Sequence, residues 1–559
     1  MDLKSIIGRC TVCGTETTKT CSRCKTVFYC GAEHQKADWK RHSKTACFPC
    51  VEEVNETLGR HLVVTRDIAA GDKIFAEGPM ITSPFSPCQC GDPSTSYKGH
   101  LLCLGCCKYV GERKEGQFTC RKCGWTLCSP NCEEAKNHFE FECDIFAQNN
   151  IRPPDNGFLL GGIDLLVLRV LLLKVKVKQP EKWAKICKLK GISIPSLIDI
   201  SMKELAGTLK FLRDGCHLSQ KEFPDDLIIK IYGIVMHNSV GRCECKFTGI
   251  GGISQWGIYE KSRFIAHSCV GNTITIRNEE KNEEALFATQ NIPSGTVLTK
   301  RFDYETIMWM GIVERRAHLN KKFDFWCNCE KCKEPYDELG TYCSAMKCSA
   351  VVKNKGKKCQ GYLLPRKNER SKNDPPGKTE DNWQCNTCGG MKSYSKCLSK
   401  IYNKEEQDID HLVQHGDLAA LVAMHEDPGT SVLHPNHCLL MKLQYHIINK
   451  IVERVLLGVY YSQTELTWLL KKLESLATKS LKVVEVLCPG HMAERAHLLI
   501  FIWISLNTIV PEHSEDPNSA YQKCLVAHQL AKEGAAILKK MQYDLHYVID
   551  ELVESLLNK

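Results

Sequence analysis

Three cysteines near the middle of the chain have the spacing of metal ligands. Cys327, Cys329 and Cys332 form a C-x-C-x2-C triplet. Thiolates suit zinc, and a closed tetrahedral zinc site needs four ligands. A fourth donor must therefore come from elsewhere in the chain. The candidate is Cys269, which lies upstream in the tetrapeptide AHSC.

Two other segments carry eight candidate ligands each, mostly in paired C-x2-C spacings. A segment this short cannot enclose a useful apolar core, so we expect two metal ions to hold each one together. In the second segment Cys107 follows Cys106 and can replace it as a ligand. The first set is Cys10, Cys13, Cys21, Cys24, Cys30, His34, His42 and Cys47, and the second is Cys103, Cys106, Cys120, Cys123, Cys128, Cys132, His138 and Cys143.

A last set comprises Cys348, Cys359, Cys385 and Cys388, with Cys343 as a competing ligand. We expect a zinc-ribbon-like site here. Cys88 and Cys90 have no evident partner and are read as an ordinary loop pair. In total, about six zinc ions would account for most of the 34 cysteines.

The order of these motifs resembles the SMYD family of SET and MYND proteins, and most closely its arthropod SmydA branch. The resemblance rests on GRHLVVTRDIAAGDKIFAEGPMI (59–81), RFIAHSCVGN (263–272), FDFWCNCEKC (323–332) and the two cysteine-rich segments, which resemble MYND zinc fingers. It implies that Cys269 joins the triplet in a post-SET zinc site. It also implies that the finger ligands interleave, as Cys10, Cys13, Cys30 and His34; Cys21, Cys24, His42 and Cys47; Cys103, Cys106, Cys128 and Cys132; and Cys120, Cys123, His138 and Cys143.

The resemblance implies an S-adenosylmethionine-dependent protein-lysine N-methyltransferase acting on histone or non-histone lysine. On the family pattern, the cofactor would contact Gly59, Arg60, Asn238, Ala266, His267 and Phe325. Two of these have simpler readings: Arg60 as a surface arginine and Asn238 as the end of a helix. Phe325, like Phe323, can equally be ordinary core.

The chain departs from the family at two positions. Ala266 stands where the family has an Asn that contacts the methyl donor, and Phe302 stands where it has a catalytic Tyr. Side chains two residues apart on a strand share a face, so a local bulge can bring Tyr304 into the catalytic position. The alternative function is a non-catalytic adaptor or transcriptional corepressor whose MYND fingers bind peptide motifs.

The helices and strands that must position these residues are predicted from the spacing of apolar residues and from the positions of prolines. We expect strands over 59–81, helices between 163 and 218 separated at Pro180 and Pro195, and a helix over 228–240. Apolar residues at helical spacing predict further helices over 466–487, 493–510 and 521–541, in an array resembling tetratricopeptide repeats.

The fold class expected is α+β multidomain, with a β-rich SET domain. The predicted parts are an N-terminal MYND finger (1–50), the first part of the SET domain (51–100), an inserted MYND-type finger (101–145), a helical insert (146–225), the core SET domain (226–310), the post-SET site with a zinc-ribbon-like segment (311–395) and an all-α C-terminal domain (396–559).

Composition sets further bounds. The composition, 43% hydrophobic and 25% charged, is typical of globular proteins. A chain of 559 residues is too long to fold around one hydrophobic core. No secretory signal is evident, so we expect a reducing compartment, cytoplasm or nucleus, in which cysteines bind metal. The net charge of +9 is spread along the chain, so nucleic acid is not expected as the primary partner. We expect a monomer that binds a protein or peptide, including histones or proline-containing motifs, and no membrane.

Overall fold

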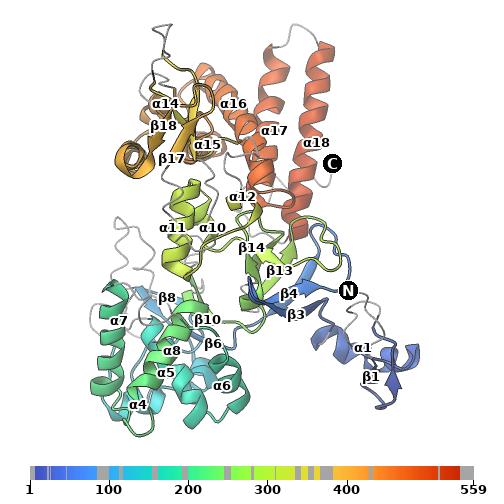
Figure 1. Cartoon of the computed structure of the whole chain (residues 1–559), viewed down its shortest axis with the longest axis vertical. Helices are drawn as coiled ribbons and strands as arrows, with labels where there is room; N and C mark the ends of the chain where they lie inside the picture. The colour runs from blue at the N-terminus through green and yellow to red at the C-terminus, as the bar shows by residue number, and fades with distance from the viewer. Residues whose placement is uncertain are drawn as a thin grey trace. The chain divides into compact units, whose positions relative to one another are not determined.

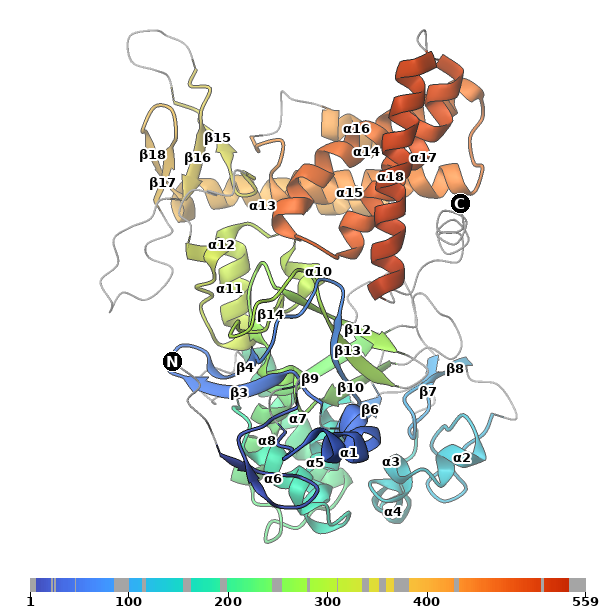
Figure 2. The ribbon, with the colours of Figure 1, turned by 90° about the vertical axis from the view of Figure 1, so that its right-hand side faces the viewer.

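The structure is a computed structural model of the chain, shown in Figures 1 and 2. It describes residues 7–21, 24, 27–45, 47–84, 100–112, 117–153, 162–191, 199–243, 254–278, 282–308, 310–333, 341–350, 358–365, 382–426, 432–513 and 517–541. Cys88, Cys90 and Pro195 lie outside this range. The chain forms two compact units, of which unit 1 comprises 1–75, 264–276 and 286–559, and unit 2 comprises 76–263 and 277–285. Their boundary falls within β5 (Lys73–Glu77), β12 (Thr273–Asn278) and β13 (Glu283–Ala288).

Unit 1 begins with a small cysteine-rich domain. Strands β1 (Gly8–Arg9) and β2 (Glu16–Thr17) pair antiparallel, and helix α1 (Ala32–Thr45) follows. Among the described residues of this domain, the buried side chains of its core cluster are Cys10, Cys21, Cys24 and Tyr29, and His42 is buried as well. Few apolar side chains are available, which is why metal must supply the stability.

A β-rich region follows in unit 1. Strand β3 (Cys50–Asn55) pairs antiparallel with β4 (Gly59–Val64), and β11 (Ala266–His267) pairs parallel with β14 (Thr299–Lys300). Backbone hydrogen bonds from Val64 to Thr296 and from Leu298 to Leu62 join the hairpin to the segment before β14. Apolar side chains from all these segments form one core, including Leu62, Val64, Ile68, Ile265, Leu286 and Leu298.

Three short helices continue unit 1, followed by a sheet. They are α10 (Tyr304–Ile307), α11 (Ile312–Phe323) and α12 (Glu330–Lys333). The sheet is four-stranded and antiparallel, with strands in the order β15 (Met346–Lys347), β16 (Tyr362–Pro365), β17 (Asn382–Cys385) and β18 (Met391–Ser393) (Figure 2).

The C-terminal part of unit 1 is helical, as the sequence predicts. After the π-helical turn η5 (Tyr394–Leu398) come α13 (Ser399–His415), α14 (Leu418–Glu426), α15 (Cys438–Leu456), α16 (Gln463–Leu487), α17 (Ala493–His513) and α18 (Pro517–Met541). Helices α17 and α18 run side by side (Figures 1 and 2). Gly534 permits this contact, because a Cβ there would lie 2.7 Å from the Ala496 carbonyl oxygen.

Unit 2 joins a small sheet, a second cysteine-rich segment and a helical layer. The sheet has the order β6 (Ile81–Pro84), β10 (Ser254–Ile258) and β9 (Ser239–Cys243). The cysteine-rich segment contains β7 (His100–Leu102), β8 (Tyr109–Glu112), α2 (Pro130–Glu133), α3 (Lys136–Phe139) and α4 (Cys143–Gln148). Helices α5 (Gly162–Val175), α6 (Pro180–Cys187), α7 (Asp199–Lys210) and α8 (Asp225–Asn238) complete the unit, with turns η3 (Phe211–Gly215) and η4 (Ser262–Phe264), the latter reaching the unit boundary.

Helix α5 is the centre of unit 2. Ten of its residues are buried, so it is covered on every side, in agreement with the apolar run over 163–175. Pro180 is the first residue of α6, where its missing N–H costs no hydrogen bond. Among the described helices, none combines the length and apolar character needed to cross a bilayer.

Candidate functional site

The four-cysteine centre predicted around Cys269 is present in unit 1. The Cys269 sulfur lies 3.8 Å from that of Cys327 and 3.5 Å from that of Cys332, and the Cys269 N–H donates to the Cys329 sulfur at 3.4 Å. All four sulfur atoms lie within 4.8 Å of one another. Strand β11 brings Cys269 to this point, and the turn into α12 presents the triplet. The arrangement can hold one tetrahedral metal ion.

A buried arginine from α11 faces this centre. Arg315 donates through Nε to the Cys269 sulfur at 3.2 Å and through Nη2 to the Cys332 sulfur at 3.6 Å. Hydrogen bonds from the neighbouring thiols hold the pKa of Cys269 well below its usual range, and the Arg315 charge acts in the same direction. The thiolate form of Cys269, which is the form that binds metal, is therefore favoured.

An aromatic cluster lies directly beside the four-cysteine centre. The His267 ring is 5.1 Å from that of Phe302 and 5.5 Å from that of Phe325, and Phe302 also packs against Phe323 at 5.3 Å. His267 accepts a hydrogen bond from the Phe302 N–H at its Nδ1, and its Nε2 lies 3.4 Å from the Cys269 sulfur. Both ring nitrogens of His267 are thus engaged within the protein.

Gly59 and Arg60 lie at the turn between β3 and β4. Gly59 has φ +64°, and no heavy atom lies within 4 Å of the position that a Cβ would take, so its backbone is open to a ligand. The Arg60 guanidinium lies 4.8 Å from the centre of the Phe264 ring, and its Nη1 is 3.7 Å from a Glu52 carboxylate oxygen.

Ala266 is half-buried next to the His267 cluster. Its N–H donates to the Leu298 carbonyl at 3.1 Å, and its methyl side chain offers no hydrogen bond. The open glycine backbone, the half-buried Phe325 ring and the β11 backbone are groups that suit a nucleoside-containing cofactor. Position 266 therefore contributes no polar side chain to this region.

Tyr304 does not share a strand with Phe302. Strand β14 ends at Lys300, Asp303 adopts a left-handed conformation with φ 50°, and Tyr304 begins α10. The alternation of strand side chains therefore does not apply across 302–304. The Tyr304 hydroxyl instead lies 3.7 Å from the Cys488 sulfur, and Arg301 lies 4.9 Å from the centre of its ring. Phe302, and not Tyr304, packs against His267.

Burial raises the pKa of Tyr304 well above its usual range. The phenol is therefore neutral near pH 7 and remains so over the alkaline range in which a free tyrosine ionises. A neutral phenol in this position stabilises the contact between the start of α10 and the end of α16.

Asn238 belongs to unit 2, where it is the last residue of α8. Its side-chain amide donates to the Lys190 carbonyl at 2.8 Å and to the Ile234 carbonyl at 2.7 Å. This is the local helix-ending role that the sequence offers as the simpler reading.

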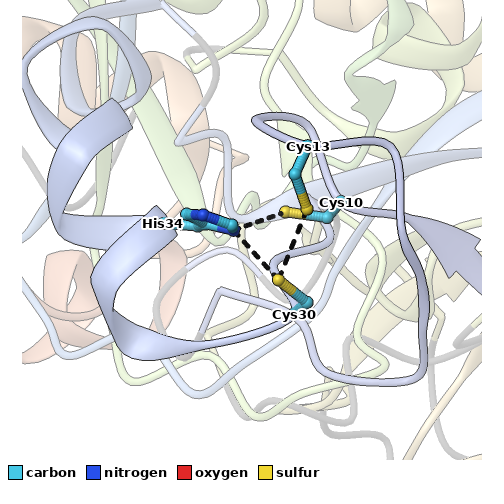
Figure 3. Close-up of side chains that lie close together, drawn as sticks. All are labelled: Cys10, Cys13, Cys30 and His34. Atoms are coloured by element: carbon cyan, nitrogen blue, oxygen red, sulfur yellow. Dashed lines mark hydrogen bonds between the residues drawn. The ribbon is translucent and has the colours of Figure 1, made fainter.

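The N-terminal cysteine-rich domain forms two metal-binding groups. Figure 3 shows the side chains of Cys10, Cys13, Cys30 and His34 pointing toward one another. The His34 Nδ1 lies 2.9 Å from the Cys30 sulfur and 3.5 Å from the Cys10 sulfur. The second group consists of Cys21, Cys24, His42 and Cys47.

The segment inserted in unit 2 also forms two groups. They are Cys103, Cys106, Cys128 and Cys132, and Cys120, Cys123, His138 and Cys143. Cys106, and not Cys107, belongs to the first group, because Cys107 has φ 64° and its sulfur lies 4.0 Å from the Thr82 hydroxyl.

Cys348, Cys359, Cys385 and Cys388 meet at one end of the β15–β18 sheet. The Cys348 sulfur is 3.7 Å from that of Cys388, and the Cys359 sulfur is 3.6 Å from that of Cys385. Cys343 is buried in the same core cluster as Cys348, Cys359 and Cys385, and that cluster continues into the helical domain.

Two arginines of unit 1 that contact the four-cysteine centre or its backbone were not predicted from the sequence. Arg315 faces the four-cysteine centre, and Arg301 donates to the Cys269 carbonyl at 2.8 Å and to the Leu487 carbonyl at 2.5 Å. In a chain with many charged residues, the positions of single arginines form no recognisable sequence motif. Only the fold brings them to thiolates and carbonyls distant in sequence.

Comparison with known proteins shows which families and relatives the chain is similar to. Residues 10–47 match the MYND finger family model. The chain is 25% identical over 375 residues to SET domain-containing protein SmydA-8, isoform A, of Drosophila melanogaster, covering 64% of this chain and 70% of the relative. It is 26% identical over 245 residues to histone-lysine N-methyltransferase SMYD3 of Mus musculus, covering 42% of this chain and 54% of the relative. These comparisons show that the chain contains a MYND finger and is similar to SMYD proteins, including SmydA-8.

Among solved structures, this chain aligns with the SET domain of LSMT bound to lysine and AdoHcy at 12% identity. The alignment covers 94% of this chain and 96% of that chain, with a TM-score of 0.28. A score of this size does not establish a common fold. The similarity to SMYD proteins rests on the sequence relatives and the MYND finger.

Proposed function

We propose that this protein binds S-adenosylmethionine and is a protein-lysine N-methyltransferase with slow methyl transfer. One observation carries the proposal: Cys269 meets the 327–332 triplet directly beside the aromatic cluster of His267, Phe302 and Phe325. A metal ion in the four-cysteine centre would fix both chain segments that border the cofactor cradle.

The residues proposed to hold the cofactor are Gly59 and Arg60 at the β3–β4 turn, Ala266 and His267 on β11, and Phe325. S-adenosylmethionine, when bound, supplies an electrophilic methyl group. The protein's own contribution is to align a neutral lysine amine with that methyl group and to exclude water. The metal ions are structural, because every group is a closed set of four ligands.

The slow rate follows from two missing polar contacts. Ala266 cannot hydrogen-bond the cofactor, and Phe302 occupies the cluster without a hydroxyl. Each lost hydrogen bond to a charged group costs roughly 1.5–3 kcal/mol. Two such losses, taken as independent, give about 3–6 kcal/mol, or roughly a hundred- to ten-thousand-fold in rate.

The cysteine groups are proposed to hold six zinc ions. Two lie in the N-terminal finger, two in the inserted finger, one in the four-cysteine centre, and one at Cys348, Cys359, Cys385 and Cys388. The protein partner is proposed to be a lysine-containing peptide, bound by a monomer in the cytoplasm or nucleus.

The direct test is transfer of tritiated methyl from S-adenosylmethionine to a panel of histones and cell-lysate proteins. We expect weak labelling above a metal-stripped control. Labelling no greater than that of the stripped protein, from a preparation that retains its zinc, would argue against the methyltransferase.

A second candidate function is that of a peptide-binding adaptor or corepressor. The N-terminal finger favours it, because Thr11, Val12, Ala37, Asp38 and Arg41 line a depression of about 380 Å³. Proline-containing peptides are the proposed ligands. Fluorescence polarisation with a labelled peptide library, compared between the intact chain and Val12→Asp, separates the candidates: binding lost in the variant, together with no methyl labelling, identifies an adaptor.

A further inference from the structure

A fully buried ionic network borders one metal-binding group of the inserted finger. His138 belongs to that group, and its Nδ1 lies 3.0 Å from the Glu142 carboxylate. Arg169 donates two hydrogen bonds to the same carboxylate, from Nε at 2.9 Å and from Nη2 at 2.6 Å. The side chains of His138 and Glu142 are 0% exposed, and that of Arg169 is 1% exposed.

The network joins elements from separate parts of unit 2. His138 lies on α3, Glu142 is the N-cap residue of α4, and Arg169 is in the middle of α5. Arg169 also donates to the Thr82 carbonyl of β6 at 2.6 Å and to the Leu104 carbonyl of the finger at 2.8 Å. One guanidinium therefore connects the finger, the sheet and the central helix.

The chemistry of the network sets the state of the histidine. An ionised carboxylate only accepts hydrogen bonds, so the Nδ1 of His138 must donate to Glu142. This leaves Nε2 as the ligand atom, and Nε2 lies 3.5 Å from the Cys123 sulfur, inside the group. A carboxylate that holds a ligating histidine in this way raises its basicity and fixes the ring.

Buried charges are costly unless they are paired and fully hydrogen-bonded. Arg169 and Glu142 meet this condition only while the finger stays closed over α5. Metal binding by the finger and packing of α5 therefore depend on each other. The finger cysteines Cys103, Cys120, Cys123 and Cys143 also belong to the main core of unit 2.

The N-terminal finger differs in this respect. Its buried residues form a small core of their own. A hydrogen bond from the Thr65 hydroxyl to the Cys24 carbonyl, 2.6 Å, ties it to the following strands.

We propose that Glu142 and Arg169 are outer-shell positioning residues of the inserted finger's metal site, and that they make metal retention there part of the folding of unit 2. The inserted finger is thus a structural part of unit 2 rather than a docking module. This inference goes beyond methyl transfer and rests on the proposed zinc at Cys120, Cys123, His138 and Cys143.

The test measures zinc loss from the full-length chain after addition of excess chelator, using a metallochromic indicator. Glu142→Gln keeps the shape of the side chain but removes its charge. We expect one zinc equivalent to leave about 10- to 100-fold faster than in wild type, the range typical of outer-shell changes. Hydrogen exchange of peptides from 162–173 should accelerate in parallel, which a purely local change in the finger would not produce.

Asp144→Asn is the matched control. Asp144 follows two residues later, on α4, but pairs with Lys122 and with Lys176 at the surface, and its side chain is 35% exposed. We expect its zinc release and hydrogen exchange to equal those of wild type. Glu142→Gln with wild-type zinc release, or with fast release but unchanged exchange of 162–173, would overturn the proposal.

Arg169→Met, compared with the double variant, distinguishes loss of the ionic network from general misfolding. Alone it leaves Glu142 buried without its partner, so we expect greater zinc loss than in Glu142→Gln. The double variant removes both charges and should retain zinc better than Arg169→Met. If the effects of the two substitutions on zinc release are simply additive in the double variant, Glu142 and Arg169 do not act as one network. Zinc content of the wild type is measured first: a wild type lacking zinc in the inserted finger refutes the zinc assignment itself, whereas full zinc with unaltered variants refutes only the network.

Discussion

At the scale of single residues, the sulfur atoms of Cys269, Cys327, Cys329 and Cys332 lie close enough together to hold one metal ion. Beside them, Ala266 and Phe302 have no side-chain group that forms hydrogen bonds. The proposed cofactor site therefore has a metal centre next to it but lacks polar side chains at these two positions.

Restoring the family residues tests this account. We expect Ala266→Asn and Phe302→Tyr each to raise methyl transfer by about 10- to 100-fold, because each restores one hydrogen bond to a charged or polarised group. Single-turnover labelling with tritiated S-adenosylmethionine measures the rate.

Phe323→Tyr is the control, since it adds a hydroxyl to the same aromatic cluster at a residue that is not among those proposed to hold the cofactor, and its rate should stay unchanged. Equal rates in all four proteins, each with full zinc content, would show that the missing polar groups do not limit the reaction.

Spacing identified the paired cysteines as candidate ligands, and the family resemblance predicted how they combine into the groups that the structure brings together. The sequence prediction failed at Tyr304, where the expectation required a continuous strand. Strand β14 ends at Lys300, and Asp303 then adopts a left-handed conformation. Asp is enriched in that conformation, but positive φ is uncommon in any residue other than Gly, so one Asp does not predict the turn. Arg315 was missed for a similar reason: its partners are thiolates that only the fold brings near.

At the scale of elements, the helical C-terminal part of unit 1 was the easiest to predict. Long apolar stripes at i, i+3 and i+4 marked α16, α17 and α18, and the structure has helices there. Short strands such as β11 and β14, of two residues each, have no such pattern. Their pairing depends on hydrogen bonds between distant segments.

Helix α17 carries a histidine that should make this region sensitive to acid. Burial lowers the pKa of His497 to about 4. An unfolded histidine binds a proton near pH 6.5, so protonation favours the unfolded state below that pH. The stability that neutral His497 contributes is complete above pH 6.5 and is lost as the pH falls toward 4, by about 1.4 kcal/mol per pH unit.

We expect His497→Leu to remove this part of the pH dependence. Urea unfolding of wild type and variant at several pH values between 7 and 5 measures the difference, and acid effects on the zinc ligands cancel in it. His411→Leu, at an exposed position on α13, serves as the control. Parallel curves for wild type and His497→Leu would show that His497 does not titrate in this range.

At the scale of the whole molecule, metal supplies stability where apolar core is scarce. The cysteine groups occur in both units, and the N-terminal finger in particular has few buried apolar side chains of its own. Native mass spectrometry of the zinc-loaded chain should therefore show six ions. A chain lacking residues 1–47 should hold four, because two groups lie in that segment.

A chelator strong enough to remove all zinc should unfold the fingers and leave α13–α18 helical, since most of the side chains in the core of this region come from the helices themselves. Circular dichroism before and after metal removal checks this expectation. Loss of nearly all helical signal would mean that the helical domain depends on metal as well.

The central claim is that the four-cysteine centre holds a cradle for S-adenosylmethionine. Isothermal titration of S-adenosylmethionine into the zinc-loaded wild type, Cys269→Ser and Cys187→Ser tests it most directly, because Cys187 is half-buried and belongs to none of the metal groups described above. The account predicts one binding site in wild type and Cys187→Ser, and none in Cys269→Ser. No binding by wild type at millimolar cofactor, or equal binding by Cys269→Ser, would contradict it.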